Sequence, residues 1–186
     1  MKDKDKQRLM LRAGVVGLAV VVALIAWLAT RGGGGASEES SAAAKSDSKM
    51  VSEAELGETA AALGQPVYWA GAQAGNELEL TELSEGGGTQ VRYVPEGTEV
   101  GGGSAALLTI GSYPLPNPEK ALEGFAKRPG SIVRHGKGGA EVVSSEESPT
   151  SAYFVSPDNS VQVEVYDPSP QRAMSLALSG RVQPAH

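Results

Sequence analysis

An uncharged apolar run close to the N-terminus constrains what this chain can form. Residues 13–30 read AGVVGLAVVVALIAWLAT, eighteen residues without a charged side chain. An α-helix of this length rises about 27 Å, close to the roughly 30 Å of a bilayer's hydrocarbon core. Trp27 lies near the outer end of the run, where an indole ring prefers the membrane interface. The run therefore predicts a transmembrane helix over residues 13–30, and through it a contact with the lipid bilayer.

The charges that flank this run predict its orientation. Cytoplasmic segments of membrane proteins carry an excess of Lys and Arg. Arg31 is the one basic residue that closely follows the run, whereas five precede it: Lys2, Lys4, Lys6, Arg8 and Arg12. We therefore expect residues 1–12 to be a basic cytoplasmic stub and the rest to lie outside the cell membrane. Cleavage after Ala36, as in a secretory signal peptide, is the alternative, but the run is longer than a usual signal-peptide core and favours an uncleaved signal-anchor.

The chain after the run divides by composition. Residues 31–50 are rich in Gly, Ser, Ala and charged residues and poor in large apolar ones. Such a segment cannot bury enough surface to offset its ordering entropy, so we predict a flexible low-complexity tether. Residues 51–186 carry most of the remaining apolar residues and are long enough to bury a core of their own. They are predicted to form one extracytoplasmic domain.

Composition excludes several kinds of site. The 186 residues contain no cysteine, which excludes disulfides, thiolate ligands and a cysteine nucleophile. The two histidines, His135 and His186, are too few for a multi-histidine metal centre. A net charge of −6 with scattered basic residues argues against nucleic acid as a partner. No metal and no cofactor is predicted.

Residue patterns in the domain predict an α+β fold, a mainly antiparallel sheet with two or three helices packed on one face. Ser52 and Glu55 match a capping box for a short helix over 52–63. Asn117 and Ser169 each precede a proline and predict two further helix starts. Strands are expected from apolar alternation and turn signals at 66–70, 78–81, 91–94, 105–112, 132–133, 142–143, 153–155 and 161–165.

The strand segments also predict two exposed glutamates and a possible internal repeat. Glu77 and Glu79 alternate with leucines, so both are predicted to lie on a solvent-facing side of a strand. Tyr113 and Tyr166 are each followed by a proline-containing turn and a helix start, which suggests a pseudo-repeat of about 53 residues. The other interpretation is that strand–turn–helix junctions converge on proline and a capping residue for local reasons.

Three short stretches carry a resemblance to a known group of proteins. AALGQPVYWAG at 61–71, LELT at 78–81 and VRYVP at 91–95 resemble uncharacterised single-pass membrane-anchored proteins of high-GC Gram-positive bacteria. These share the plan of a basic N-terminus, one span, a low-complexity tether and a small external domain. The resemblance covers residues 61–95 and implies a location in the cell envelope. No activity is assigned to that group, so no residue role is carried over.

Few residues stand out as candidates for chemistry. The glycines around Lys137 lack the spacing and the Ser or Thr of a phosphate-binding loop. His135 has serines and Glu141 nearby in sequence, but no catalytic motif accompanies it, and an exposed loop histidine is favoured. No catalytic residue is therefore assigned.

Two pairs of residues are candidates for contacts. Tyr68 and Trp69 would face opposite sides of a strand, so one could be exposed as a ligand or partner contact; packing in the core is the alternative. Ala13 and Gly17 have the small-x-x-x-small spacing that would pair two spans in a homodimer.

These observations predict a single-pass envelope protein with a cytoplasmic N-terminus. Its external domain is expected to bind an envelope protein, a wall polymer or a small ligand without catalysis. Two alternatives stay open: an envelope hydrolase whose residues form no linear motif, and a transmembrane regulatory protein that acts through lateral association of its span.

Overall fold

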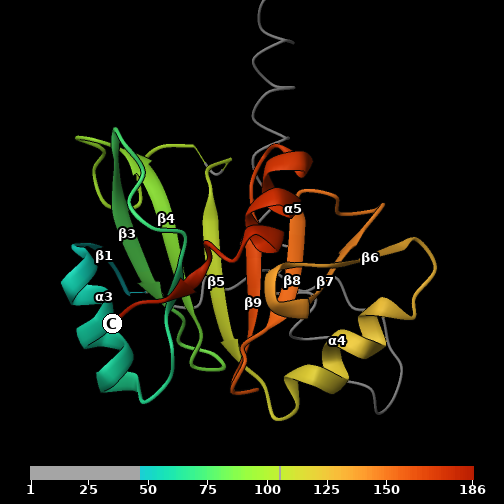
Figure 1. Ribbon diagram of the computed structural model, residues 1–186. Coiled ribbons are helices and arrows are strands. Elements are labelled where there is room, and N and C mark those ends of the chain that lie inside the picture. The colour runs from blue at the N-terminus through green and yellow to red at the C-terminus, as the bar shows by residue number, and fades with distance from the viewer. Residues whose placement is uncertain (1–46, 105) are drawn as a thin grey trace, which may run out of the picture. The chain divides into compact units, whose positions relative to one another are not determined.

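The computed structural model describes residues 47–104 and 106–186. The predicted cytoplasmic stub, the span with its Ala13 and Gly17 pair, and the tether up to residue 46 lie outside the described residues. Within them, strands pair antiparallel throughout one sheet in the order β1-β3-β4-β5-β9-β8-β7-β6, and β2 pairs with β10 (Figure 1). The predicted class, a mainly antiparallel sheet with helices, is confirmed.

Ten strands are described. The first five are β1 (Asp47–Val51), β2 (Tyr68–Trp69), β3 (Asn76–Glu82), β4 (Thr89–Pro95) and β5 (Thr109–Pro114). The second five are β6 (Ser131–His135), β7 (Glu141–Ser145), β8 (Ser151–Val155), β9 (Val161–Tyr166) and β10 (Gln183–Pro184). Among the described residues three α-helices accompany them: α3 (Glu53–Leu63), α4 (Pro118–Ala126) and α5 (Pro170–Ser179). None of these helices is long and apolar enough to cross a membrane.

All three helix starts form as the capping signals predict. Ser52 accepts a hydrogen bond from the Glu55 backbone N–H, and the Glu55 carboxylate accepts one from the Ser52 N–H, which completes the capping box. Asn117 and Ser169 cap α4 and α5, each with proline in the first turn. Gly64 ends α3 in the left-handed conformation that glycine adopts without a Cβ penalty. These contacts are local, which is why the sequence alone predicts them.

The fold begins before the predicted domain boundary. Asp47 to Val51 form β1, and each residue pairs with a residue of β3. Residues 47–50, assigned to the tether by composition, therefore belong to the sheet. Ser48 illustrates why: its hydroxyl lies 2.9 Å from that of Thr81 on β3, a cross-strand pair that a polar, glycine-rich context does not reveal.

Two strand predictions need correction. The strand expected at 105–112 begins instead at Thr109 and ends at Pro114. Glu79, predicted to face solvent, is 2% exposed, because the loop over 96–103 covers this part of the sheet and supplies a hydrogen-bond donor to the carboxylate. The alternation of Leu and Glu correctly indicated the side of β3 on which Glu79 lies. No residue close to Glu79 in the sequence indicated that a loop covers that side.

The helices lie on both faces of the sheet, so the expectation of one helical face is wrong. We call the two faces the α5 face and the α4 face. On the α5 face, Phe154 and Val163 pack in one apolar core with α3, α5 and the β2–β10 pair. On the α4 face, Phe125 packs edge-to-face on Tyr153, with ring centroids 5.4 Å apart. Tyr153 and Phe154 are neighbours in β8 and so point to opposite faces.

The strand order places two similar halves side by side. The first half supplies β1-β3-β4-β5 and the second supplies β9-β8-β7-β6, and β5 pairs with β9 where the halves meet. Each of these central strands leads into a helix that begins at a proline, Pro118 or Pro170. This order leaves β1 and β6 as the two edges of the sheet (Figure 1).

Candidate functional site

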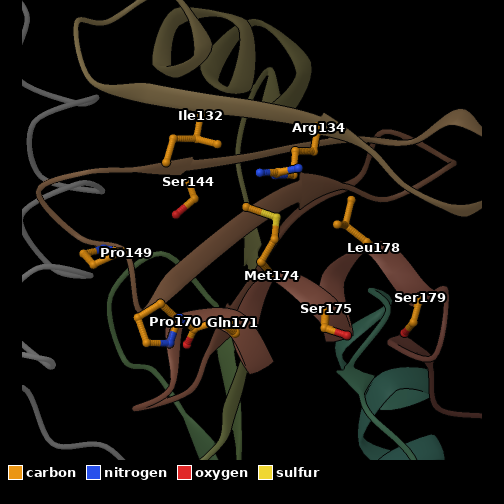
Figure 2. A pocket seen from close by; sticks show the side chains of 10 residues that line it. All are labelled: Ile132, Arg134, Ser144, Pro149, Pro170, Gln171, Met174, Ser175, Leu178 and Ser179. Carbon is orange, nitrogen blue, oxygen red and sulfur yellow. The ribbon is translucent and has the colours of Figure 1, made fainter.

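An open pocket of about 690 Å³ lies on the α5 face, between helix α5 and the last two strands of the sheet. Strands β6 and β7 form its floor, the β7–β8 loop closes one side, and α5 forms its wall (Figure 2). The residues that line it are Ile132, Arg134, Ser144, Pro149, Pro170, Gln171, Met174, Ser175, Leu178 and Ser179. We call this the α5 pocket.

The position of α5 explains why the pocket exists. The helix buries Ala173, Leu176 and Ala177 and makes most of its contacts with β8 and β9. Because a helix is about 10 Å across and strands are about 4.8 Å apart, α5 covers roughly two strands. Strand β6 extends beyond it, so Ile132 is only partly buried and Arg134 is exposed, whereas Val142 and Ser144 of β7 are buried. Met174 and Leu178, on the flank of the helix, are only partly buried.

Apolar groups dominate the pocket, and one cation stands in it. The Arg134 side chain extends over the strands toward Ile132 and Met174 (Figure 2). Arg134 is exposed and is not among the ion pairs of the described residues, which join Lys49 to Glu82, Arg92 to Glu79, Lys127 to Glu123 and Arg172 to Asp167. The pocket therefore offers a guanidinium that no carboxylate of the described residues neutralises.

Two of the three serine hydroxyls that line the pocket are donors to backbone carbonyls. Ser144 donates its hydroxyl proton to the Ser151 carbonyl at 2.8 Å, and Ser179 donates to the Leu176 carbonyl at the same distance. A nucleophilic serine needs a hydrogen bond to a base. His135 lies one residue beyond Arg134 on β6, exposed and opposite Glu141 in the register, and as the next residue on the strand its side chain points to the other face.

A buried carboxylate lies on the opposite face of the sheet. Glu164 in β9 is 2% exposed and accepts three hydroxyl hydrogen bonds. Ser151 and Tyr153 donate to one carboxylate oxygen at 2.8 and 2.9 Å, and Tyr113 donates to the other at 3.1 Å. Gln90 in turn donates to the Tyr113 oxygen at 3.0 Å. We call Glu164, Ser151, Tyr153 and Tyr113 the Glu164 cluster.

Burial controls the protonation of this cluster. Loss of hydration raises the pKa of Glu164, while the three hydroxyl donors act in the opposite direction and lower it. Burial and the neighbouring carboxylate both raise the pKa of Tyr113 and of Tyr153. The phenols therefore stay protonated and serve as donors, and the cluster holds β5, β8 and β9 together across the sheet. The α4 helix covers it through the Phe125 ring.

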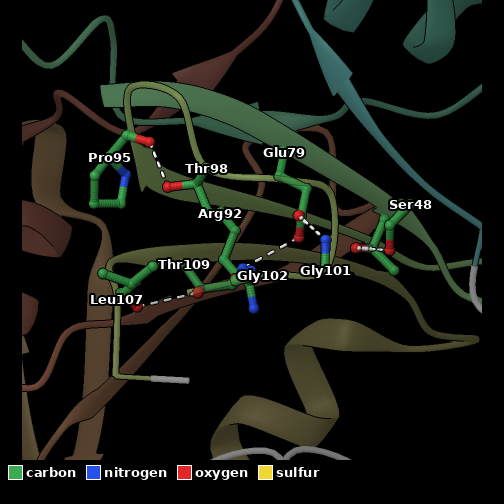
Figure 3. A network of polar contacts seen from close by, with 10 residues as sticks. Ser48, Glu79, Arg92, Pro95, Thr98, Gly101, Gly102, Leu107 and Thr109 are labelled. Atoms are coloured by element: carbon green, nitrogen blue, oxygen red, sulfur yellow. Dashed lines mark hydrogen bonds and ion pairs between the residues drawn. The ribbon is translucent and has the colours of Figure 1, made fainter. Parts of the chain in front are cut away.

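A second polar cluster fixes the loop over 96–103 (Figure 3). Glu79 lies 3.2 Å from the Arg92 Nε and accepts a hydrogen bond from the Gly101 backbone N–H at 2.6 Å. Arg92 donates through Nη2 to the Gly102 carbonyl at 2.6 Å. The two charged side chains are 3% and 22% exposed. Both bind the loop backbone, so this cluster acts as a clamp on the loop.

The structure buries both residues predicted as candidate contacts. Tyr68 and Trp69 are each 4% exposed, and the Tyr68 ring packs edge-to-face on Phe154 with centroids 6.0 Å apart. They lie in the β2–β10 pair and are not among the residues that line the α5 pocket. Their position fits the core interpretation, and a contact role for them stays a prediction that the structure does not test.

Sequence reasoning did not single out Arg134 or identify the pocket. The residues of α5 carry no local signal that β6 and β7 lie beside this helix. Glu164 was missed for a similar reason, since a Glu between valines is typical of a half-exposed strand. Among the described residues, no group of three or more His, Asp or Glu side chains is placed to hold a metal ion.

Comparison with known proteins gives no relative from which a role could be taken. No family model, no curated protein and no solved structure matches this chain.

Proposed function

We propose that this chain is a single-pass protein of the cell envelope, N-terminus in the cytoplasm, whose external domain binds a ligand or partner without catalysis. The apolar run over 13–30 and its basic flank support the membrane anchor and its orientation. The α5 pocket supports binding, because this open hollow beside α5 is lined by apolar groups and by Arg134, which is in none of the ion pairs of the described residues. That pocket is the observation on which the proposal depends.

The absence of an assembled base and nucleophile at the pocket favours binding over the hydrolase alternative. Ser144 and Ser179 donate to backbone carbonyls, and the buried Glu164 lies on the other face beneath α4. A regulatory role through pairing of the spans at Ala13 and Gly17 depends on residues outside the described part of the chain, and it stays a separate proposal.

The orientation is tested with single cysteines, since the chain has none of its own. Glu85, exposed in the turn between β3 and β4, is replaced by cysteine, and Lys4→Cys provides the matched site in the predicted cytoplasmic stub. A membrane-impermeant maleimide added to intact cells is expected to label Glu85→Cys and to leave Lys4→Cys unlabelled until the cells are opened. Labelling in the reverse order would contradict the proposed topology.

Use of the pocket is tested in the same cells. A photoreactive benzoylphenylalanine is placed at Leu178 in the pocket or at Glu119, an exposed residue of α4. After irradiation we expect a discrete adduct from position 178 but not from 119. Ser175→Trp, which fills the pocket from an exposed helix position, should abolish that adduct. Equal adducts from both positions would show that the pocket is not the binding site.

A further inference from the structure

The α5 pocket has the length and lining of a site for a single alkyl chain. Its lining includes the first residue of α5, Pro170, and the last, Ser179. A helix of 10 residues rises about 15 Å, so the pocket follows a wall of that length. Met174 and Leu178 of this wall and Ile132 of the floor supply apolar lining, and methionine is a flexible side chain that adapts to an apolar ligand.

One positive charge, and no negative one, lines this pocket. Arg134 is the charged member of the lining, and the other polar members are serines and a glutamine. A guanidinium presents its N–H groups as a planar fork that matches a carboxylate, and such charge-assisted bonds are strong. An occupant with one anionic group and an apolar body complements this lining, whereas a cationic or a polyanionic occupant does not.

The position of the pocket also distinguishes a small amphiphile from a peptide strand. A peptide that extends the sheet would pair with the free edge of β6 in the plane of the sheet. The pocket instead lies above the sheet, because Ile132 of β6 and Ser144 of β7 are register partners and both form its floor. The space is therefore on the face of the two strands, beside the helix, where an alkyl chain fits without backbone hydrogen bonds.

We infer that the α5 pocket binds a fatty-acid-type ligand, a single alkyl chain with a terminal carboxylate. The carboxylate pairs with Arg134, and the chain lies along α5 against Met174, Leu178 and Ile132. This inference rests on the proposed binding function and names its ligand class. It places the site on a domain that the sequence predicts to be tethered near a bilayer, where such amphiphiles concentrate.

The test uses the full chain in its own membranes and dodecanoate that carries a photoreactive diazirine on its terminal carbon. After irradiation, adducts are mapped by mass spectrometry. Residues 13–30 provide an internal reference, because a probe dissolved in the bilayer is expected to label the predicted span in every variant. We expect additional adducts in the α5 segment around Met174 and Leu178. Unlabelled dodecanoate should compete for them, and dodecyltrimethylammonium, with the same chain and the opposite charge, should not.

Two variants and a matched control identify the groups responsible. Arg134→Gln should lower pocket labelling by up to about fivefold relative to the span, because Arg134 is exposed and an exposed charge pair contributes up to about 1 kcal/mol. Ser175→Trp should abolish it. Lys120→Gln removes a positive charge from exposed α4 and should leave labelling unchanged. Thermal unfolding of each variant shows whether the fold is retained, and Arg134→Gln keeps the test decisive if the tryptophan variant unfolds.

Adducts on the span alone, or pocket adducts that the cation displaces as well as dodecanoate does, would overturn the inference. The proposed function is judged separately by the benzoylphenylalanine adduct at position 178. If that adduct forms while dodecanoate does not label the pocket, the site binds another class of ligand. If neither forms, the binding function itself is contradicted.

Discussion

Glu164 occupies the middle of an antiparallel sheet, where a carboxylate is costly to bury. Three hydroxyl donors offset part of that cost, and no ion pair of the described residues includes this side chain. Because burial raises its pKa above the ordinary 4.5, the native state binds the proton more tightly than the unfolded chain does. The contribution of this group to stability therefore rises as the pH falls through the native pKa toward 4.5.

Glu164→Gln should remove this pH dependence. The amide keeps the shape of the side chain and does not titrate, so the free energy of unfolding of the wild type relative to the variant should rise as the pH is lowered through the native pKa of Glu164 toward the ordinary 4.5. Denaturant unfolding monitored by Trp69 fluorescence measures it, with Trp27 replaced by Phe so that one tryptophan reports. Glu82→Gln, a partly exposed position on β3, is the control. Parallel pH profiles for the wild type and Glu164→Gln would contradict the assignment.

Gly111 provides the space that lets Tyr113 reach Glu164. The Tyr113 ring lies back over Gly111, and a Cβ at position 111 would lie 2.5 Å from the ring carbon that bears the hydroxyl. Gly111→Ala should therefore displace the phenol and lower the free energy of unfolding by about 1–3 kcal/mol. Gly124→Ala is the matched control, because nothing lies within 4 Å of a Cβ in that α4 position. It should instead stabilise the helix by about 0.5–1 kcal/mol. The same sign for both substitutions would refute this account.

At the scale of elements, local signals predicted the helices and most strands. They did not predict which loops or helices pack over each strand. Ser52, Asn117 and Ser169 satisfy backbone donors within three residues along the chain. These helix starts can therefore be predicted from the sequence alone. The environment of Glu79 depends on Gly101, which lies 22 residues away. The alternation of apolar and polar residues gives no sign of this contact between distant residues. It predicted the strand correctly, but it wrongly indicated that Glu79 is exposed.

The Glu79–Arg92 clamp should contribute far more to the free energy of unfolding than an exposed ion pair on the same strand does. Glu79→Gln leaves Arg92 without its partner in a largely buried site, and we expect a loss of about 3 kcal/mol. The Gly101 amide, which donates to Glu79, should also exchange its hydrogen faster. Glu82→Gln removes the pair with Lys49, whose side chains are 39% and 54% exposed, and should cost about 0–1 kcal/mol. Denaturant unfolding compares the two, and equal losses would show that the clamp contributes nothing specific.

At the scale of the whole molecule, the strand order decides where the pocket lies. β6 occupies one edge of the sheet, and α5, which begins 35 residues after β6 ends, covers β8 and β9. Most elements, β1 and β10 excepted, were predicted from their own residues, but their arrangement comes from long-range pairings such as Gly111 with Glu164 across β5 and β9. The α5 pocket could not be predicted for that reason, whereas the α+β class, set by the element types, could.

Long-range pairing also places the N-terminal boundary of the folded domain at β1, before the boundary predicted from composition. Cleavage by trypsin can locate this boundary. Lys45 precedes β1, whereas the bond after Lys49 lies within β1, where Lys49 and Met50 pair with Leu80 and Glu79. Because a protease needs an unpaired, extended substrate, the first stable fragment of the full chain should begin at Ser46. N-terminal sequencing of the resistant band measures this.

A variant at the expected cleavage site makes the result decisive. With Lys45→Gln, cleavage should retreat to Arg31, the preceding basic residue, and the fragment should begin at Gly32. It should not advance to Met50, because cleavage there would require β1 to leave the edge of the sheet and expose the backbone of β3. A fragment that begins at Met50 in either protein would show that β1 is not held in solution, and that the composition-based boundary was the right one.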